Sequence, residues 1–217
     1  MTTGETSPAS PPGLRESKKQ ETRQLISDVA TGLFLAHGFE QTTIAEIAVA
    51  ARVAKKTVTN YFPRKEDLAL DHQDAFIASL AGTVASRQVG ESALSALRRA
   101  FTDAATVADP VAGFSGPDFA HIIADSPTLS ARLRDLHDLR EAALADALAD
   151  ATGAPRGDIT PRTAAALLGA VHRALFQRIQ ELTLTGQDNA RISATVIAEA
   201  DSAFGLLEPS LADYAAA

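Results

Sequence analysis

The sequence predicts an all-α fold, and three observations support this prediction. Apolar residues recur at spacings of three and four along most of the chain, which places them on one face of an α-helix. Glycine and proline residues separate these periodic segments. No segment shows the alternation of apolar and polar residues, bounded by hairpin turns, that is typical of β-strands.

The composition narrows the class of protein. A chain of 217 residues with 46% hydrophobic residues and a mean hydropathy near zero is typical of a soluble globular protein. The absence of cysteine excludes disulfides, thiolate catalysis and zinc sites built from cysteine. No apolar run is long enough to span a bilayer, and the N-terminus lacks the layout of a secretion signal. We therefore expect a cytoplasmic protein without a membrane partner.

The first helix is expected to follow a short tail. Residues 1–13 contain three prolines and are predicted to be disordered. A helical pattern begins near Leu14 and ends at His37, where Gly38 is suited to a helix C-cap. This helix opens a predicted domain of residues 14–64. Two adjacent apolar stripes mark its inner side: Leu25, Val29 and Leu33, and beside them Ile26, Ala30 and Phe34.

A short second helix is predicted to begin at Thr42 or Thr43. Glu46 follows Thr43 by three residues, which is the spacing of a capping box. A turn at residues 51–54 leads into a third helix over residues 55–62. Two short helices joined by a tight turn form a helix-turn-helix, whose second helix can enter the major groove of DNA.

The third helix has the two faces that DNA recognition requires. Val53, Val58 and Phe62 are predicted to anchor it, and Pro63 ends it. Its outward face carries lysines that can reach guanine or phosphate, threonines that can touch thymine methyl groups, and Asn60, which can pair with adenine. Nearby hydroxyls and helix N-termini are placed to hold phosphates. The predicted DNA-contacting residues are Thr42, Thr43, Lys55, Lys56, Thr57, Thr59, Asn60, Tyr61 and Lys65.

Charge is distributed unevenly along the chain. The net charge of −7 by itself argues against a nucleic-acid partner. Residues 1–70, however, carry nine Lys and Arg against eight Asp and Glu, whereas residues 71–217 carry eleven against nineteen. All the lysines lie in residues 1–70. This clustering either serves a function or arose by chance. A local basic surface on an acidic body is typical of a DNA-binding protein with a separate regulatory domain.

Residues 65–217 are predicted to form a helical regulatory and dimerisation domain. Helices are expected at roughly 65–86, 91–107, 117–125, 128–151, 160–185 and 189–207. The last two are strongly apolar, so they either supply half of a four-helix interface with a second copy or pack into the core of the monomer. We favour the dimer, because a helix-turn-helix usually reads two half-sites. The positions concerned are Ala164, Leu167, Leu168, Val171, Leu175, Ile179 and Leu182, and Ile192, Val196, Ile197, Ala200, Phe204 and Leu207.

The segment Gly38–Leu68 resembles the DNA-binding domain of TetR-family transcriptional regulators, and the resemblance covers roughly residues 18–70. The residues that carry it are Gly38-Phe39, Thr42-Thr43, Ile47-Ala48, Tyr61-Phe62 and Lys65-Glu66-Asp67-Leu68. Beyond this segment, the all-helical layout and the stretch Ser126-Pro127-x-Leu129 are similar to many members. The resemblance implies a homodimeric repressor that binds a pseudo-palindromic DNA operator and is released by a small-molecule inducer. No cofactor is expected.

The turn of the helix-turn-helix departs from the family pattern. Members usually have Gly-Val-Ser there, whereas this chain has Arg52-Val53-Ala54. Without the glycine we expect Arg52 to adopt a positive φ, at a cost on the order of 1 kcal/mol. Without the serine the third helix loses an N-cap hydroxyl, typically worth about 1 kcal/mol. These changes bear on the operator sequence and not on DNA binding itself.

The resemblance also implies an inducer pocket among the C-terminal helices. An aromatic residue on a helix is more often part of the core, so the sequence supplies only candidates for the lining. The segment 109–117, rich in glycine and proline, is a candidate gate. The candidate lining residues are Phe76, Phe101, Phe114, Phe119, His121, His137, His172, Phe176 and Gln177.

Other functions find little support in the sequence. There is no Gly-x-Ser-x-Gly elbow, no phosphate-binding glycine loop and no His-Glu-x-x-His, so we predict no enzyme and assign no catalytic residue. The pairs His121–Asp125 and His137–Glu141 have a spacing that suits metal ligands, but such pairs are more often helix-surface contacts. The alternative is a helical protein-interaction or small-molecule-binding module without sequence-specific DNA binding. It leaves the basic face of the third helix unexplained.

Overall fold

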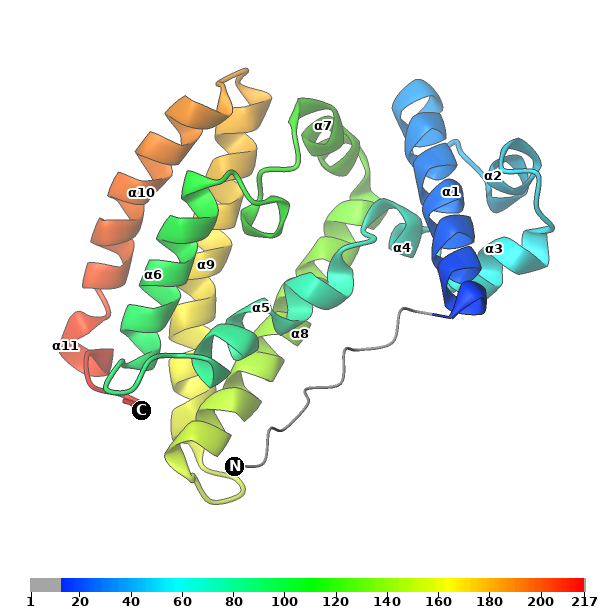
Figure 1. The fold of residues 1–217 in the computed structure, drawn as a ribbon. Helices are drawn as coiled ribbons and strands as arrows, with labels where there is room; N and C mark the ends of the chain where they lie inside the picture. Colours follow the sequence, from blue (N-terminus) through cyan, green and yellow to red (C-terminus); the bar gives the residue numbers. More distant parts are fainter. Residues whose placement is uncertain (1–12, 217) are drawn as a thin grey trace, which may run out of the picture. The chain divides into compact units, whose positions relative to one another are not determined.

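The computed structural model describes residues 13–216, and in this range it contains helices and no strand (Figure 1). The all-α prediction is therefore confirmed. The chain divides into two compact units whose boundary lies between Ala69 and Leu70, five residues after the predicted one. The predicted tail, residues 1–13, lies outside the described residues except for Gly13.

Each unit is built from helices joined by short turns. None of the described helices combines the length and the apolar composition needed to cross a bilayer. The first unit contains α1 (Leu14–His37), α2 (Ile44–Ala50), α3 (Lys55–Tyr61) and α4 (Glu66–Ala69). The second contains α5 (Gln73–Ala85), α6 (Ala93–Thr106), the 3-10 turn η1 (Pro110–Ala112), α7 (Pro117–Asp125), α8 (Pro127–Thr152), α9 (Ile159–Leu184), α10 (Asn189–Gly205) and α11 (Glu208–Leu211).

One side of α1 supplies much of the core of the first unit. Of its two predicted stripes, the one formed by Ile26, Ala30 and Phe34 is buried, whereas Leu25 of the other is exposed. The rings of Phe34 and Phe39 lie 5.0 Å apart, so the residue after the C-cap glycine folds back onto the helix. The other helices complete this core with Ile47, Val58, Phe62 and Leu68.

The helix predicted over residues 65–86 is two helices in the structure, α4 and α5. α4 packs against α1, with Leu68 and Ala69 buried. Asp67 accepts a hydrogen bond from the backbone N–H of Arg64 at 3.0 Å, which satisfies a free donor before α4. Neither glycine nor proline marks the break at residues 70–72, which is why the sequence pattern did not reveal it.

The long helices α8 and α9 form the centre of the second unit (Figure 1). α5 packs against α8, α8 against α9, α9 against α10, and α10 against α6. Their facing sides bury one apolar cluster that includes Leu97, Leu148, Leu168 and Phe204. Four of these helices begin at a side chain that accepts a hydrogen bond from the first turn: Ser92 for α6, Ser126 for α8, Asp158 for α9 and Asp188 for α10.

The apolar stripes of α9 and α10 face this core. Val171, Ile197 and Leu207 are partly buried against it, and Leu167 is exposed. The remaining positions are all buried: Ala164, Leu168, Leu175, Ile179, Leu182, Ile192, Val196, Ala200 and Phe204. Packing into the monomer core is therefore the correct alternative for these residues. They give no support to a dimer, because helices of the same chain already cover them: α8 packs against α9, α6 against α10, and α9 and α10 against each other.

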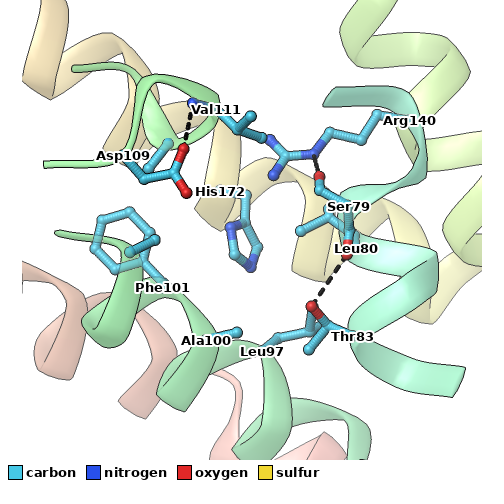
Figure 2. A pocket seen from close by; sticks show the side chains of 12 residues that line it. Ser79, Leu80, Thr83, Leu97, Ala100, Phe101, Asp109, Val111, Arg140 and His172 are labelled. Atoms are coloured by element: carbon cyan, nitrogen blue, oxygen red, sulfur yellow. Dashed lines mark hydrogen bonds between the residues drawn. The ribbon is translucent and has the colours of Figure 1, made fainter. Parts of the chain in front are cut away.

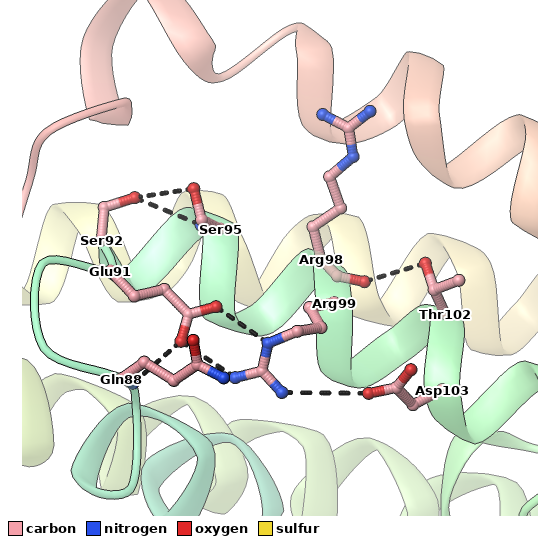
Figure 3. Close-up of polar contacts among 8 residues, drawn as sticks. All are labelled: Gln88, Glu91, Ser92, Ser95, Arg98, Arg99, Thr102 and Asp103. Carbon is pink, nitrogen blue, oxygen red and sulfur yellow. Dashed lines mark hydrogen bonds and ion pairs between the residues drawn. The ribbon is translucent and has the colours of Figure 1, made fainter.

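Ion pairs fix the start of α6 on the protein surface (Figure 3). Arg99 donates two hydrogen bonds to the carboxylate of Glu91, both at 2.9 Å, and its Nη1 lies 3.8 Å from Asp103. The hydrogen bond from Arg99, followed by one from the backbone N–H of Gln88, lowers the pKa of Glu91 to about 2. The two parallel hydrogen bonds specify geometry more than they add stability, because water screens exposed charges.

A smaller aromatic cluster joins α5, α8 and α9. The ring of His137 lies edge-on to those of Phe76 and Phe176, with centroid distances of 5.0 Å and 5.2 Å. Its side chain is buried, and this burial, assisted by the charges of Arg140 and Arg173, lowers the pKa of His137 to about 4. His137 is therefore neutral at physiological pH and packs as an aromatic residue.

We predict that His137 makes the protein less stable in mild acid. The pKa of His137 is about 4 when folded and near 6.5 when unfolded, so the unfolded state binds more protons between these values and stability falls as the pH drops through this window. At pH 5 the expected loss relative to pH 7 is about 2 kcal/mol. Urea unfolding of the wild type and of His137→Phe at both pH values measures it. The variant keeps the edge-on packing but cannot be protonated, and an equal pH dependence of the two proteins would contradict the prediction.

Candidate functional site

The first helix of the helix-turn-helix, α2, begins at a complete capping box. The hydroxyl of Thr43 accepts a hydrogen bond from the backbone N–H of Glu46 at 3.2 Å, and the Glu46 carboxylate accepts one from the backbone N–H of Thr43 at 2.8 Å. The second bond is the largest cause of a lowered pKa of Glu46. The predicted capping box is confirmed, and it fixes where α2 starts.

The turn between α2 and α3 shows both predicted consequences of its unusual residues. Arg52 has a φ of 55°, in the left-handed region that favours glycine. The backbone N–H groups of Arg52 and Val53 donate to the carbonyls of Val49 and Ala48, and these bonds close the end of α2. Ala54 is the N-cap of α3 and makes no side-chain hydrogen bond. The turn therefore keeps its shape without the residues that would stabilise it best.

The inner side of α3 anchors it in the core of the first unit. Val58 and Phe62 are almost completely buried, and Val53 is partly buried just before the helix. The guanidinium of Arg23 on α1 lies 4.5 Å from the centre of the Phe62 ring. All three residues predicted to anchor the helix thus point inward, and they fix which side of α3 faces water.

The outer side of α3 is polar and basic. Lys55, Lys56 and Asn60 are exposed, and neither lysine has an ion-pair partner among the residues that the structure describes. Thr59 is partly exposed, and its hydroxyl donates to the carbonyl of Lys56 at 3.1 Å. Thr57 is partly exposed at the flank of this face. The face therefore offers free cations, an amide and methyl groups within two turns of helix.

Two of the residues that we predicted to contact DNA instead make hydrogen bonds within the first unit. Thr42 is buried, and its hydroxyl donates to the carbonyl of Gly38 at 2.9 Å. The ammonium of Lys65 donates to the carbonyls of Phe39 and Thr42 at 2.9 Å and 3.1 Å, and it lies 4.2 Å from the centre of the Phe39 ring. Both residues hold the segment between α1 and α2 in place, so neither is part of the interface proposed below.

The second unit contains a cavity of about 150 Å³ between α5, α6, η1, α8 and α9 (Figure 2). Its polar lining consists of Ser79, Thr83, Asp109, Arg140 and His172. Leucine, alanine, valine and phenylalanine side chains form the remainder. The cavity is thus an apolar space with a few polar groups aimed into it, which is the usual composition of a small-molecule site.

The segment that contains the helix-turn-helix matches a known protein family. Residues 26–71 match the family described as bacterial regulatory proteins of the tetR family. Over these residues the chain is similar to the DNA-binding domain of TetR-family regulators. It is similar to the transcriptional regulator TcmR of Streptomyces glaucescens, with 38% identity over 90 residues, and to MftR of Mycobacterium tuberculosis, with 35% identity over 65 residues. The matched segments span only 40% and 33% of those two proteins, and 42% and 30% of this chain.

Solved structures share the fold of this chain beyond the helix-turn-helix. NalD, the secondary repressor of the MexAB-OprM multidrug efflux pump in Pseudomonas aeruginosa, is 18% identical and superposes with a TM-score of 0.55 over 85% of this chain and 97% of NalD. A TetR-family regulator from Streptomyces coelicolor is 19% identical, with a TM-score of 0.54 over 91% of this chain and 99% of that protein. At these identities the likeness concerns the fold alone.

The nine residues predicted to line a pocket lie in different places. Phe101 and His172 line the cavity. Phe76, His137 and Phe176 form the aromatic cluster described above, and Phe114 is part of the main core. Phe119, His121 and Gln177 are partly or fully exposed. Sequence reasoning missed Arg140 and Ser79 and predicted Asp109 only as part of the gate. Nothing in the local pattern separates a buried arginine from one that faces water.

The candidate gate forms one wall of the cavity. Asp109 accepts a hydrogen bond from the backbone N–H of Val111 at 2.7 Å, which shapes η1. Gly113 follows with a φ of 126°, and a Cβ atom there would lie 3.3 Å from the ring of Phe176. The side-chain amide of Gln180 donates to the Gly113 carbonyl at 2.5 Å. The wall is therefore a short turn, and it packs closely against α9 because Gly113 has no side chain.

The two pairs with metal-ligand spacing gather no further ligands. Among the described residues, no group of three His, Asp or Glu side chains could hold a metal ion. His121 and Asp125 lie exposed on α7, and the ring of His137 is packed between two phenylalanines.

We predict that Arg52→Gly stabilises the first unit by about 0.5–1 kcal/mol. The substitution removes the cost of a positive φ, which exceeds the entropy that glycine adds to the unfolded chain. The matched control is Ala50→Gly at the end of α2, which should destabilise by up to about 1 kcal/mol because the backbone there is helical. Chemical denaturation measures both changes, and a lower stability of Arg52→Gly would show that the turn is not strained.

Proposed function

We propose that this protein is a transcriptional repressor that binds a pseudo-palindromic DNA operator as a homodimer and is released by a small molecule. The exposed face of α3, with its unpaired Lys55 and Lys56 beside Asn60, is the observation that carries the proposal. In a bacterium such a regulator would act in the cytoplasm, where the chromosome lies.

The face of α3 has the chemistry of major-groove recognition. An asparagine amide can bond both edge groups of an adenine, and a lysine can reach the acceptors of guanine. Thr59 can touch a thymine methyl group. Thr43, at the N-terminus of α2, and Tyr61 are proposed phosphate contacts that set the register of the protein on the duplex. Because the chain as a whole carries a net charge of −7, DNA affinity depends on these few contacts and decreases steeply with salt.

The cavity of the second unit supports the proposed control by a small molecule. It lies within a helical body and joins polar groups to an apolar lining. Among the fold neighbours, NalD is described as a repressor, and the structure of SmeT is a complex with triclosan. We propose that ligand binding in this chain alters the helices around the cavity and thereby lowers the affinity for the operator.

The outer side of α8 and α9 is the proposed dimer interface. A groove between the two helices is lined by small residues that include Ala142 and Ala166, and also by the charged residues Asp138, Glu141 and Arg162. Exposed apolar side chains lie on the same helices, with Leu139 47%, Leu167 41% and Ile159 65% exposed. Small residues let helices approach closely, and exposed apolar residues gain from burial. A second copy related by a two-fold axis would bury both in a four-helix arrangement.

We predict that the double substitution Lys55→Ala and Asn60→Ala weakens specific DNA binding at least about tenfold, because it removes two base-edge contacts. Fluorescence anisotropy with duplexes from the region upstream of the protein's own gene, against shuffled duplexes, measures the effect. Arg191→Ala removes the same net charge from an exposed position on α10 and should leave binding unchanged. If the wild type binds specific and shuffled DNA alike, the assignment of α3 is wrong.

We predict that Ala166→Arg converts the dimer into a monomer, because a charged side chain in the groove prevents the close approach of a second copy. Light scattering after size-exclusion chromatography at micromolar concentration measures the mass. Ala198→Arg, at an exposed position on α10, is the control and should remain dimeric. A monomeric wild type, or a dimeric Ala166→Arg variant, would refute this interface.

A further inference from the structure

We infer that the cavity of the second unit binds a small monocarboxylic acid with a ring-sized apolar body, and that Arg140 holds its carboxylate. The inference rests on the proposed ligand-controlled function and adds the chemistry of the ligand. Two buried polar side chains that face the cavity, together with its volume, carry the argument.

Arg140 is a buried cation without a counter-charge. Its side chain is only 6% exposed, its Nε donates to the hydroxyl of Ser79 at 2.9 Å, and its guanidinium lies 4.4 Å from the centre of the Phe76 ring. Burial lowers the pKa of Arg140 to about 10, so it is charged at neutral pH. Among the described residues no carboxylate lies within 4.0 Å of it. A buried charge without a partner is costly to the fold, which points to a role other than stability.

The free part of the guanidinium faces the cavity. Figure 2 shows it reaching from α8 toward Val111 and the region above His172. A guanidinium has five N–H donors, and the bond to Ser79 uses the one on Nε. The four donors on the two Nη atoms are thus left for a ligand. Their planar fork matches the two oxygens of a carboxylate, which can accept two parallel hydrogen bonds.

His172 supplies a second polar contact without a second charge. Its side chain is 6% exposed, and its Nε2 is buried with no hydrogen-bond partner among the described residues. The ring lies edge-on to Phe101 and Phe204, at 6.0 Å and 5.4 Å. Burial keeps the pKa of His172 well below its ordinary value, so the imidazole is neutral. A neutral imidazole can exchange one hydrogen bond with the ligand but does not attract a second anionic group.

The volume and the remaining lining set the size and charge of the ligand. An apolar cavity of 150 Å³ accommodates a molecule the size of benzene, and this cavity has about that volume. Leu80, Leu97 and Phe101 provide apolar contacts for such a body. Asp109 lies on the wall formed with η1, so a second anionic group on the ligand would meet an acidic side chain and not a second cation. Benzoate therefore matches the volume of the cavity and the single cation in its lining.

Calorimetry on the full chain without DNA tests the inference, with benzoate and its neutral isostere benzamide as probes. We expect benzoate to bind at least about tenfold more tightly than benzamide, because only benzoate forms charge-assisted hydrogen bonds with Arg140. Arg140→Met should lose this preference, and Arg140→Lys should keep a smaller one. Arg134→Met, at an exposed position on the same helix, should bind benzoate as the wild type does. In the absence of ligand, Arg140→Met should melt at the same temperature or higher.

Three results would overturn the inference: no benzoate binding, equal binding of benzoate and benzamide, or unchanged benzoate binding by Arg140→Met. If Arg140→Met does not fold, the two probes on the wild type and on Arg140→Lys decide the question. The proposed function is tested separately by operator binding. Specific DNA binding without benzoate binding would overturn only the inferred ligand site. Benzoate binding without specific DNA binding would overturn the proposed repressor function and would leave the inferred ligand site in place.

Discussion

The first unit depends on the burial of one side of a seven-residue helix. Isolated helices as short as α3 are not stable in water, because one or two turns cannot repay the cost of nucleation. α3 therefore exists because Val58 and Phe62 are packed into the core that α1 supplies. The same burial determines that Lys55, Lys56 and Asn60 face outward. The contacts of Lys65 with Phe39 and Thr42 add a second constraint, since they hold the segment before α2 against the residues after α3.

Local signals predicted the first unit in detail. The capping box of Thr43 and Glu46, the positive φ of Arg52 and the missing cap at Ala54 each depend on one or two neighbouring residues, so the sequence was enough to predict them. The break between α4 and α5 depends instead on where α4 packs, and no glycine or proline marks it. Thr42 and Lys65 were expected on the surface for a related reason. A threonine or lysine pattern does not reveal which backbone carbonyls lie nearby in space.

In the second unit, the periodicity of apolar residues predicted which side of a helix is buried but not which element packs against it. The spacing of apolar residues showed that α9 and α10 each bury one side, but a buried side can face either a neighbouring helix or another subunit. The structure packs α8 against α9, α6 against α10, and α9 and α10 against each other, and it leaves the smaller residues of α8 and α9 outside. The same limit applies to predicting the cavity from the sequence. Its most distinctive group, Arg140, is one arginine among many in the sequence and becomes unusual only when its burial and its lack of a counter-charge are known.

For the proposed ligand, the wall of the cavity near Gly113 would link exchange to a very local motion. η1 is joined to α9 by the hydrogen bond from Gln180 and by the close seating of Gly113 on Phe176, and these contacts can break while the long helices stay packed. The free energy of such an opening is much smaller than that of global unfolding. The proposed ligand would thus enter and leave on the timescale of a loop motion. The speed of a regulatory response would then be set by a three-residue turn, independently of how stable the helical body is.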